Sequence, residues 1–267
     1  MSEAVVQFTG EIPRYYDRCL GPVMFEPYAA DLLARVPMRE GLRVLEIACG
    51  TGIVTRHLRQ ALPASASLVA TDLNEAMLSY ARASQPAGGV SWQVADAQAL
   101  PFEDGSFDVV ACQFGVMFLP DKPQGFREAR RVLAPGGLLL VNVWRALEEN
   151  PYAQAAHAML ARRYPDDPPR FFETPYGYHD PDRLRADLAA GGWDRVRLDD
   201  VRLEAASPSA AELADGFVHG SPLAHELVAR GAELEAFAAD LAREFAALGG
   251  GTPCRTQLSA TVITAER

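Results

Sequence analysis

The stretch Val44–Gly52 constrains the fold of this chain more than any other part of its sequence. It reads Val-Leu-Glu-Ile-Ala-Cys-Gly-Thr-Gly, an apolar run typical of a buried strand that ends in a turn with two glycines. Apolar residues at helical spacing follow at Ile53, Val54, Leu58 and Leu62. Glycine lets a backbone approach a ligand closely and adopt positive φ, and a helix start offers free N–H groups. The stretch therefore predicts a strand, a turn and a helix that cradle a nucleotide-like ligand.

The acid that ends the next apolar run narrows the kind of nucleotide. Ser67–Thr71 reads as a second strand, and Asp72 follows it, 20 residues after Gly52 (72 − 52). A carboxylate at this place can accept hydrogen bonds from both hydroxyls of a ribose. A pyrophosphate-binding turn has the pattern G-x-G-x-x-G, but here Gly52 is followed by Ile-Val-Thr, so the third glycine is absent. The sequence favours a ligand with an adenosine and no pyrophosphate, and it disfavours a nicotinamide-dependent dehydrogenase.

Strand and helix patterns alternate through residues 42–145. Strands are predicted at 42–48, 67–72, 90–95, 107–113 and 138–144, with helical patterns between them. This alternation predicts an α/β fold with a parallel, doubly wound sheet, whose ligands bind outside the carboxyl ends of the strands. Four polar residues are expected at that edge: Glu46, Asp72, Asp96 and Gln113.

The segments on either side of this core are mostly helical. Residues 1–40 are predicted to form an N-terminal helical lid, 41–148 the ligand-binding core, 149–255 a helical cap with a sixth strand, and 256–267 the last strand. Asp180 and Pro181 are a typical helix start, and a long amphipathic helix is expected at 232–248. The sixth strand, near 196–203, is expected to be interrupted or bulged, while residues 210–230 fit no single pattern. Residues 257–265 alternate as a strand does.

Five segments between residues 40 and 145 together resemble class I S-adenosylmethionine-dependent methyltransferases. The resemblance lies in Val44–Gly52, Asp72–Leu78, Val94–Phe102, Phe107–Phe114 and Arg131–Gly137, in this order and spacing. It is greatest with ubiquinone and menaquinone C-methyltransferases and with methyltransferases of natural-product pathways. The resemblance implies a Rossmann-like seven-stranded sheet, mostly parallel, with an antiparallel last strand. It also implies that the fifty or so residues between the sixth and seventh strands are a cap inserted where relatives have a short hairpin.

The resemblance assigns cofactor roles to individual residues. Asp72 would bind the ribose, Asp96 and the Ala97 backbone the adenine, and Glu46 with the glycine turn the methionine part. Gln113 and Phe114 would lie near the sulfonium. A helix-capping role is the alternative for Asp96, and a structural role is an equal alternative for Gln113. The complete expected set is Tyr16, Glu46, Ala48, Gly50, Thr51, Gly52, Asp72, Leu73, Met77, Asp96, Ala97, Gln113 and Phe114.

Ala48 departs from the family pattern, which usually has glycine at this position. Alanine is the next smallest residue, so we expect it to be tolerated, with an ordinary negative φ.

The residues that would act on an acceptor are poorly determined by the sequence. Methyl transfer from a sulfonium is a direct displacement, so the protein mainly positions the reactants and excludes water, and a general base is needed only if the acceptor must lose a proton. Candidates for such a base are His219, His179, Tyr178 and His157, and a surface or hydrogen-bonded structural role is the favoured alternative for each histidine. Tyr15, Tyr16 and Phe25 are expected to form an aromatic lid, and Phe171, Phe172, Tyr176 and Tyr178 to line an acceptor pocket. Packing in the core is the alternative for both groups.

Composition disfavours several classes of function. The net charge of −10 disfavours nucleic acid as a substrate and docking on anionic membranes. The four cysteines form no C-x-x-C pair, and no metal-binding cluster is expected. Residues 1–4 have no basic region and no apolar run, and no stretch approaches the length of a membrane span, so a cytoplasmic protein is expected.

The prediction is a methyltransferase that uses S-adenosylmethionine, yields S-adenosylhomocysteine and acts on O, C or N of a small molecule. A monomer and a homodimer both fit the sequence. The alternative outside enzymes is a non-catalytic S-adenosylmethionine-binding protein or regulator. A polyamine synthase on the same fold is disfavoured because Cys112–Gly115 provides no acid for a polyamine.

Overall fold

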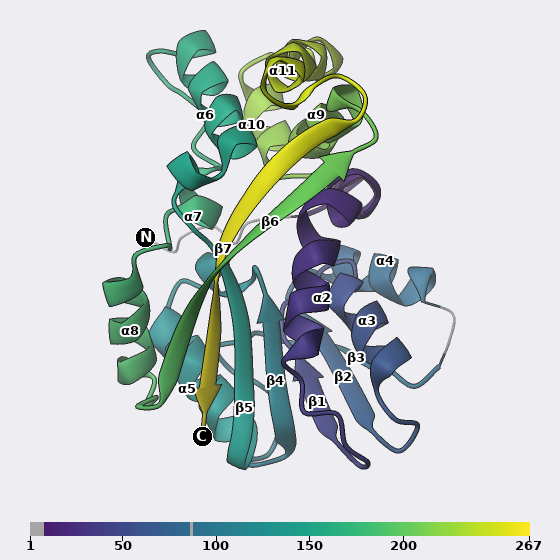
Figure 1. Ribbon diagram of the computed structural model, residues 1–267, viewed down its shortest axis with the longest axis vertical. Coiled ribbons are helices and arrows are strands. Elements are labelled where there is room, and N and C mark those ends of the chain that lie inside the picture. The colour runs from purple at the N-terminus through teal and green to yellow at the C-terminus, as the bar shows by residue number, and fades with distance from the viewer. Residues whose placement is uncertain (1–7, 86–87) are drawn as a thin grey trace.

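A seven-stranded sheet organises the part of the chain that the structure describes, residues 8–85 and 88–267 of a computed structural model. The strand order is β3-β2-β1-β4-β5-β7-β6 (Figure 1). Strands β1 to β5 are parallel, and β7 runs antiparallel to its neighbours β5 and β6. The strands are β1 (Arg43–Glu46), β2 (Ser67–Asp72), β3 (Ser91–Val94), β4 (Phe107–Gln113), β5 (Leu133–Trp144), β6 (Val196–Ser207) and β7 (Cys254–Glu266). The predicted fold class, a doubly wound and mostly parallel sheet with an antiparallel last strand, is confirmed.

Helices cover both faces of the sheet, as the alternating sequence pattern requires. Helices α2 and α3 lie on one face and α5 on the other (Figure 1). The helices that flank the sheet are α2 (Glu26–Ala34), α3 (Ile53–Ala61), α4 (Glu75–Ser84), α5 (Lys122–Val132) and α8 (Pro181–Ala190). Two short 3₁₀ turns are η2 (Val116–Phe118) and η3 (Leu147–Glu149). Helix α8 begins as predicted, because the side chain of Asp180 accepts a hydrogen bond from the Asp182 N–H.

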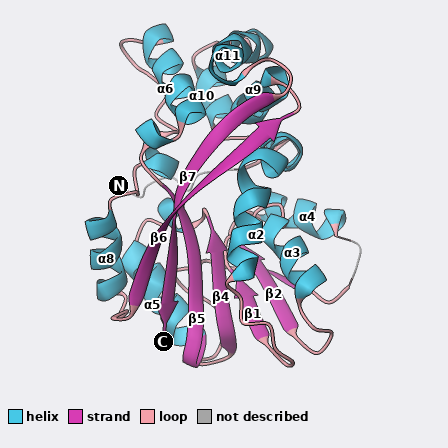
Figure 2. Ribbon diagram, viewed as in Figure 1, coloured by secondary structure: helices cyan, strands magenta, loops and turns pink. Residues whose placement is uncertain are grey.

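The remaining helices gather at one end of the molecule, beyond the carboxyl edge of the parallel strands (Figure 2). They are α6 (Pro151–Arg163), α7 (Glu173–Tyr176), α9 (Ala210–His219), α10 (Leu223–Ala229) and α11 (Leu234–Gly249). Strands β6 and β7 extend beyond the ends of the parallel strands and reach this group of helices (Figure 1). Helices α9 and α10 occupy the segment whose sequence fitted no single pattern, and α11 begins two residues after the predicted start.

The N-terminal segment packs between this cap and the sheet. It consists of α1 (Ile12–Tyr15), the wide-turn helix η1 (Tyr16–Phe25) and α2. Helix η1 is a π-helix, in which hydrogen bonds span five residues, as from the Glu26 N–H to the Gly21 carbonyl. Residues 1–7 of the predicted lid, including those assessed for a signal peptide, lie outside the described residues.

The prediction of an interrupted sixth strand is wrong. Strand β6 pairs with β7 without a register shift from Val196 to Ser207. The acidic pair Asp199–Asp200 lies within this continuous strand. Neighbouring side chains in a strand point to opposite faces, and each acid here meets its own arginine: Asp199 pairs with Arg35 at 2.6 Å, and Asp200 with Arg145.

Strand β5 begins at Leu133, five residues earlier than predicted. Its pairing with β4 shifts between Phe107 and Val109, so the glycine turn expected before the strand is an irregularity within it. Within the described part of the chain, no helix is both long and apolar enough to cross a membrane.

Candidate functional site

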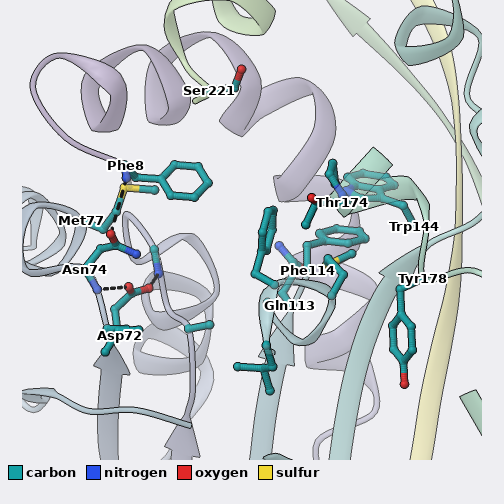
Figure 3. A pocket seen from close by; sticks show the side chains of 18 of the residues that line it. Phe8, Asp72, Asn74, Met77, Gln113, Phe114, Trp144, Thr174, Tyr178 and Ser221 are labelled. Atoms are coloured by element: carbon teal, nitrogen blue, oxygen red, sulfur yellow. Dashed lines mark hydrogen bonds between the residues drawn. The ribbon is translucent and has the colours of Figure 1, made fainter. Parts of the chain in front are cut away.

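A cavity of about 720 Å³ opens where the parallel strands end. Its size falls within the range of about 300–1,000 Å³ that is usual for small-molecule sites. The segments that follow β1, β2, β3 and β4 and the last residue of β5 contribute to its wall, together with η1, α7 and the loop after α9. Figure 3 shows two chemically different sides, with Asp72 and Asn74 on one and the rings of Phe114 and Trp144 on the other.

The glycine turn after β1 adopts the conformation that its sequence indicates. Gly50 and Gly52 have φ of 56° and 79°, values that favour glycine. A Cβ on Gly50 would meet nothing closer than 3.9 Å, so its face toward the cavity is open. Gly52 serves a different purpose: a Cβ there would lie 3.1 Å from the Cβ of Ala81, so it allows α4 to pack closely. Gly52 and Thr51 do not line the cavity.

The prediction for the backbone of Ala48 is wrong. Ala48 has φ of 53°, in the left-handed region, instead of an ordinary negative value. The neighbours impose this turn, because the Ile47 N–H bonds to β4 at Ala111 and the Cys49 N–H bonds to β2 at Thr71. A non-glycine residue in this region costs about 1–2 kcal/mol. Ala48 lines the cavity, so a locally unfavourable conformation lies at the site.

Asp72 lies at the end of β2, with its carboxylate partly occupied by the backbone. Oδ2 accepts from the Gly50 N–H and Oδ1 from the Asn74 N–H, both at 2.8 Å. Burial raises the pKa of this carboxyl, and the N–H donors oppose that rise. Each carboxylate oxygen has a second lone pair, so Asp72 can still accept hydrogen bonds from a diol in the cavity. Leu73, which follows it, leaves an apolar side chain 46% exposed at the cavity.

Glu46 does not line the cavity, although it was expected to contact the ligand. Its side chain is buried and accepts a hydrogen bond from the Thr55 hydroxyl of α3. Burial raises the pKa of Glu46 to about 8. In the structure this acid supports the junction between β1 and α3 beneath the glycine turn.

The segment after β3 supplies Asp96, Ala97 and Gln98 to the polar side of the cavity. Asp96 Oδ1 accepts from the Gln98 N–H at 2.8 Å, which makes a tight turn. No helix begins there, so the helix-cap alternative for Asp96 does not apply.

Gln113 and Phe114 lie at the border between the two sides. The Gln113 amide donates to the Phe25 carbonyl at 3.1 Å and accepts from Asn142 at 3.3 Å, which holds it in place. Phe114 has φ of 52°, and its ring stacks on Trp144 with 3.8 Å between centroids. A phenylalanine in the left-handed region is rare, and here the Phe114 N–H bonds to the Asn142 carbonyl of β5 at 3.0 Å.

The aromatic side of the cavity is larger than the sequence indicated. Tyr16 stacks on Phe25 at 4.5 Å, and Trp144 stacks on Tyr176 at 5.9 Å. Tyr16, Phe25, Phe171, Phe172 and Tyr176 all line the cavity, whereas Tyr15 turns away from it and stacks on His219.

Several lining residues were missed, among them Met24, Trp144, Thr174 and Ser221. Trp144 could have been predicted from the sequence, because it is the last residue of a predicted strand and such strands end at the ligand-binding edge. Thr174 turns its hydroxyl toward the cavity interior (Figure 3), but nothing in its local sequence marks it.

None of the candidates for a catalytic base directs its basic atom into the cavity. Tyr178 lines it, but its hydroxyl points away (Figure 3) and donates to Asp187 at 2.9 Å. Burial raises the pKa of Tyr178, and the hydrogen bond to Asp187 adds to that rise. Within residues 8–85 and 88–267, no histidine lines the cavity: His219 packs on Tyr15, and His179 meets the Tyr176 carbonyl. His157 belongs to α6 and is not among the lining residues.

The described residues contain no cluster of three or more histidine, cysteine or acidic side chains that could hold a metal ion. The four cysteines, Cys19, Cys49, Cys112 and Cys254, are buried and unpaired.

Comparisons with known proteins agree with this geometry. A family model described as a methyltransferase domain matches residues 45–141. The ubiquinone/menaquinone biosynthesis C-methyltransferase UbiE of Idiomarina loihiensis is 39% identical over 108 residues, 39% of this chain and 43% of that protein. The UbiE enzyme of Pseudomonas aeruginosa is 33% identical over 173 residues, 60% of this chain and 68% of that protein. The chain spans about half the length of several of these curated relatives.

A solved structure with the same fold is the phosphoethanolamine N-methyltransferase 2 of Haemonchus contortus, in complex with phosphomonomethylethanolamine and S-adenosylhomocysteine. It superposes with a TM-score of 0.60 at 16% identity, over 96% of this chain and 56% of that chain. This similarity concerns the fold alone.

Proposed function

Because the chain belongs to the class I S-adenosylmethionine-dependent methyltransferases, we propose that it transfers the methyl group of S-adenosylmethionine to an apolar, ring-containing small molecule. The observation that carries the proposal is the two-sided cavity. One side offers a buried carboxylate, an open glycine turn and an exposed apolar Leu73, and the other is a wall of aromatic rings.

The polar side fits the cofactor that the family uses. Asp72 has free acceptor capacity for the ribose hydroxyls, and Gly50 leaves open space beside it. Asp96 and Ala97 would hold the adenine, with Leu73 and Met77 against its faces. The sulfonium supplies an activated methyl group when the cofactor is bound. Phe114 and Tyr16 both line the cavity, and aromatic rings favour a nearby cation.

The chain's own residues then act by placement. Hydrogen bonds to the Phe25 carbonyl and from the Asn142 amide fix the side chain of Gln113, which lies at the border between the two sides of the cavity. The rings of Phe25, Trp144 and Tyr176 exclude water from the acceptor side, which favours a direct displacement. No histidine lines the cavity within the described residues, so the ring proton that methylation of carbon releases would pass to water or to another lining group.

The aromatic wall supports a flat, apolar acceptor over a charged one. The ionised side chains near that wall are engaged within the protein: Glu173 pairs with Arg170, Arg183 pairs with Asp187, and Lys122 donates to the Leu119 carbonyl and lies over the Tyr178 ring. The matching relatives carry the name of ubiquinone and menaquinone biosynthesis, whose products contain such rings. Of the three acceptor atoms that the sequence left open, carbon is the one that these names support.

The proposal needs no partner chain, since one chain lines the cavity on both sides; a monomer and a homodimer are both compatible with it. Four unpaired buried cysteines support a reducing, cytoplasmic location.

Calorimetric titration with S-adenosylmethionine, S-adenosylhomocysteine and NAD, with Asp72→Ala as control, tests the cofactor. We expect micromolar binding of the first two, lost in the variant. Binding of NAD alone, or of none, would refute the proposal.

Transfer of a labelled methyl group to a panel of hydroxylated naphthalenes, with phosphoethanolamine as a charged control, tests the acceptor. Cofactor binding without transfer to any of them would favour the non-catalytic binding protein instead.

A further inference from the structure

The wide-turn helix η1 places two pairs of residues together that an ordinary helix would separate. Tyr16 and Phe25 are nine residues apart, and so are the acids that follow them, Asp17 and Glu26. Nine residues of α-helix make about 2.5 turns and rise about 13.5 Å, which would put the members of each pair on opposite faces. In the structure the two rings stack at 4.5 Å with 14° between their planes.

The stacked rings face the cavity, and the acids face the core helix α3. Arg56 of α3 lies between the two carboxylates. Its Nη2 atom is 3.1 Å from Asp17 Oδ1 and 3.3 Å from Glu26 Oε1. The same guanidinium therefore pairs with the acid after each ring, at both ends of the wide-turn segment.

Further contacts tie this arrangement to the core. The Tyr80 hydroxyl of α4 donates to Asp17 at 3.4 Å, and His57 bonds to Glu26. Arg56 Nη1 donates to the Thr51 carbonyl at 3.3 Å, which connects the cluster to the glycine turn. The side chains of Arg56 and Asp17 are only 25% and 20% exposed, so solvent screens their attraction incompletely.

We propose that Arg56 is a positioning residue that holds η1 in its π-helical conformation. In this conformation the Tyr16 and Phe25 rings stay stacked beside the cavity. Without the guanidinium, two carboxylates held near one point would repel each other, and the repulsion would favour rewinding of the segment. Rewinding to an α-helix would carry Tyr16 and Phe25 to opposite faces and open the border between the polar and aromatic sides. The inference rests on the proposed function only in naming S-adenosylhomocysteine as the ligand of the cavity.

The test compares Arg56→Met with Arg59→Met. Arg59 is on the same helix and makes partly buried or exposed hydrogen bonds, but only to carbonyls of the loops at 62–66 and 89, away from η1. Amide hydrogen exchange over residues 16–25 of the ligand-free protein is the first readout, and the Kd of S-adenosylhomocysteine is the second.

We expect exchange over 16–25 to rise in Arg56→Met alone. We expect its affinity for S-adenosylhomocysteine to fall about tenfold, as for the loss of a partly buried charge network. Combining Arg56→Met with Asp17→Asn and Glu26→Gln should restore much of the protection from exchange and much of the affinity, because neutral amides do not repel each other. If Arg56 had only a structural role, these two further substitutions would not rescue the protein.

Equal exchange over 16–25 in the Arg56→Met and Arg59→Met proteins would overturn the inference. So would a rescue variant no better than Arg56→Met alone. If the unaltered protein failed to bind S-adenosylhomocysteine, the proposed function would fall, and the exchange measurement would still decide the role of Arg56.

Discussion

Replacing Asp72 by asparagine should separate ligand binding from folding in a measurable way. The carboxylate accepts the Gly50 and Asn74 N–H groups through different oxygens, both at 2.8 Å. An asparagine can satisfy one of them, while its NH₂ group faces the other donor. A buried donor left without a partner costs about 1–3 kcal/mol, so we expect the free energy of unfolding to fall by roughly 2 kcal/mol.

The loss of affinity should be larger. Two ribose hydroxyls that donate to a charged acceptor contribute about 1.5 kcal/mol or more each, so the Kd of S-adenosylhomocysteine should rise on the order of a hundredfold. Urea denaturation measures the first quantity, and calorimetric titration of the folded variant measures the second.

Asp108→Asn is the matched control. Asp108 is another partly buried carboxylate at a strand, but it binds the Arg43 backbone and guanidinium, which lower its pKa, and it does not line the cavity. This variant should lose stability and keep its affinity. The reasoning fails if folded Asp72→Asn binds S-adenosylhomocysteine as tightly as the unaltered protein, or if Asp108→Asn weakens binding equally.

Three further predictions concern Glu46, Ala48 and Tyr178. The pKa of Glu46 is raised to about 8 in the folded protein from an ordinary 4.5. Between these two pH values the folded state keeps a proton that the unfolded state has lost. The free energy of unfolding should therefore fall as the pH rises from about 4.5 to 8. Glu46→Gln should therefore flatten the pH dependence of the melting temperature between about pH 4.5 and 8, and an unchanged slope would show that Glu46 is ionised in the folded protein. Ala48→Gly should relieve the φ of 53° and stabilise the protein by about 1 kcal/mol in urea denaturation; a loss of stability would mean that the alanine methyl group matters more than the strain. Tyr178→Phe removes the hydrogen bond to Asp187, so about 1 kcal/mol of stability should be lost while the rate of methyl transfer is retained, and a hundredfold slower rate would restore Tyr178 as a catalytic candidate.

The parts of the site that follow from local rules could be predicted from the sequence. A buried strand that runs into Gly50 and Gly52 has few alternatives, because positive φ and the start of α3 depend on neighbours in the chain. The strand and helix alternation predicted the parallel sheet, and a parallel sheet brings Asp72, Asp96 and Gln113 to one edge wherever the rest of the chain lies.

The sequence failed where distant contacts override local preference. Ala48 adopts a left-handed φ because β2 and β4 each bond to one of its neighbours. Glu46 stands at the predicted strand end, yet its carboxylate turns toward Thr55 of α3 and away from the cavity. The helical spacing of Tyr15, Tyr16 and Phe25 could not show that η1 winds widely and pairs two of them.

By itself, then, the sequence determined the sheet, its ligand-binding edge and the chemistry of the polar side of the cavity, because each depends on periodicity or on a turn of a few residues. Only the tertiary structure decided the aromatic side. Phe25, Phe114, Trp144 and Tyr176 come from four separate elements and meet through packing alone. Their contacts join residues as far apart as Phe25 and Trp144, 119 positions (144 − 25), and no local pattern in the chain records which of its many apolar side chains will share a wall.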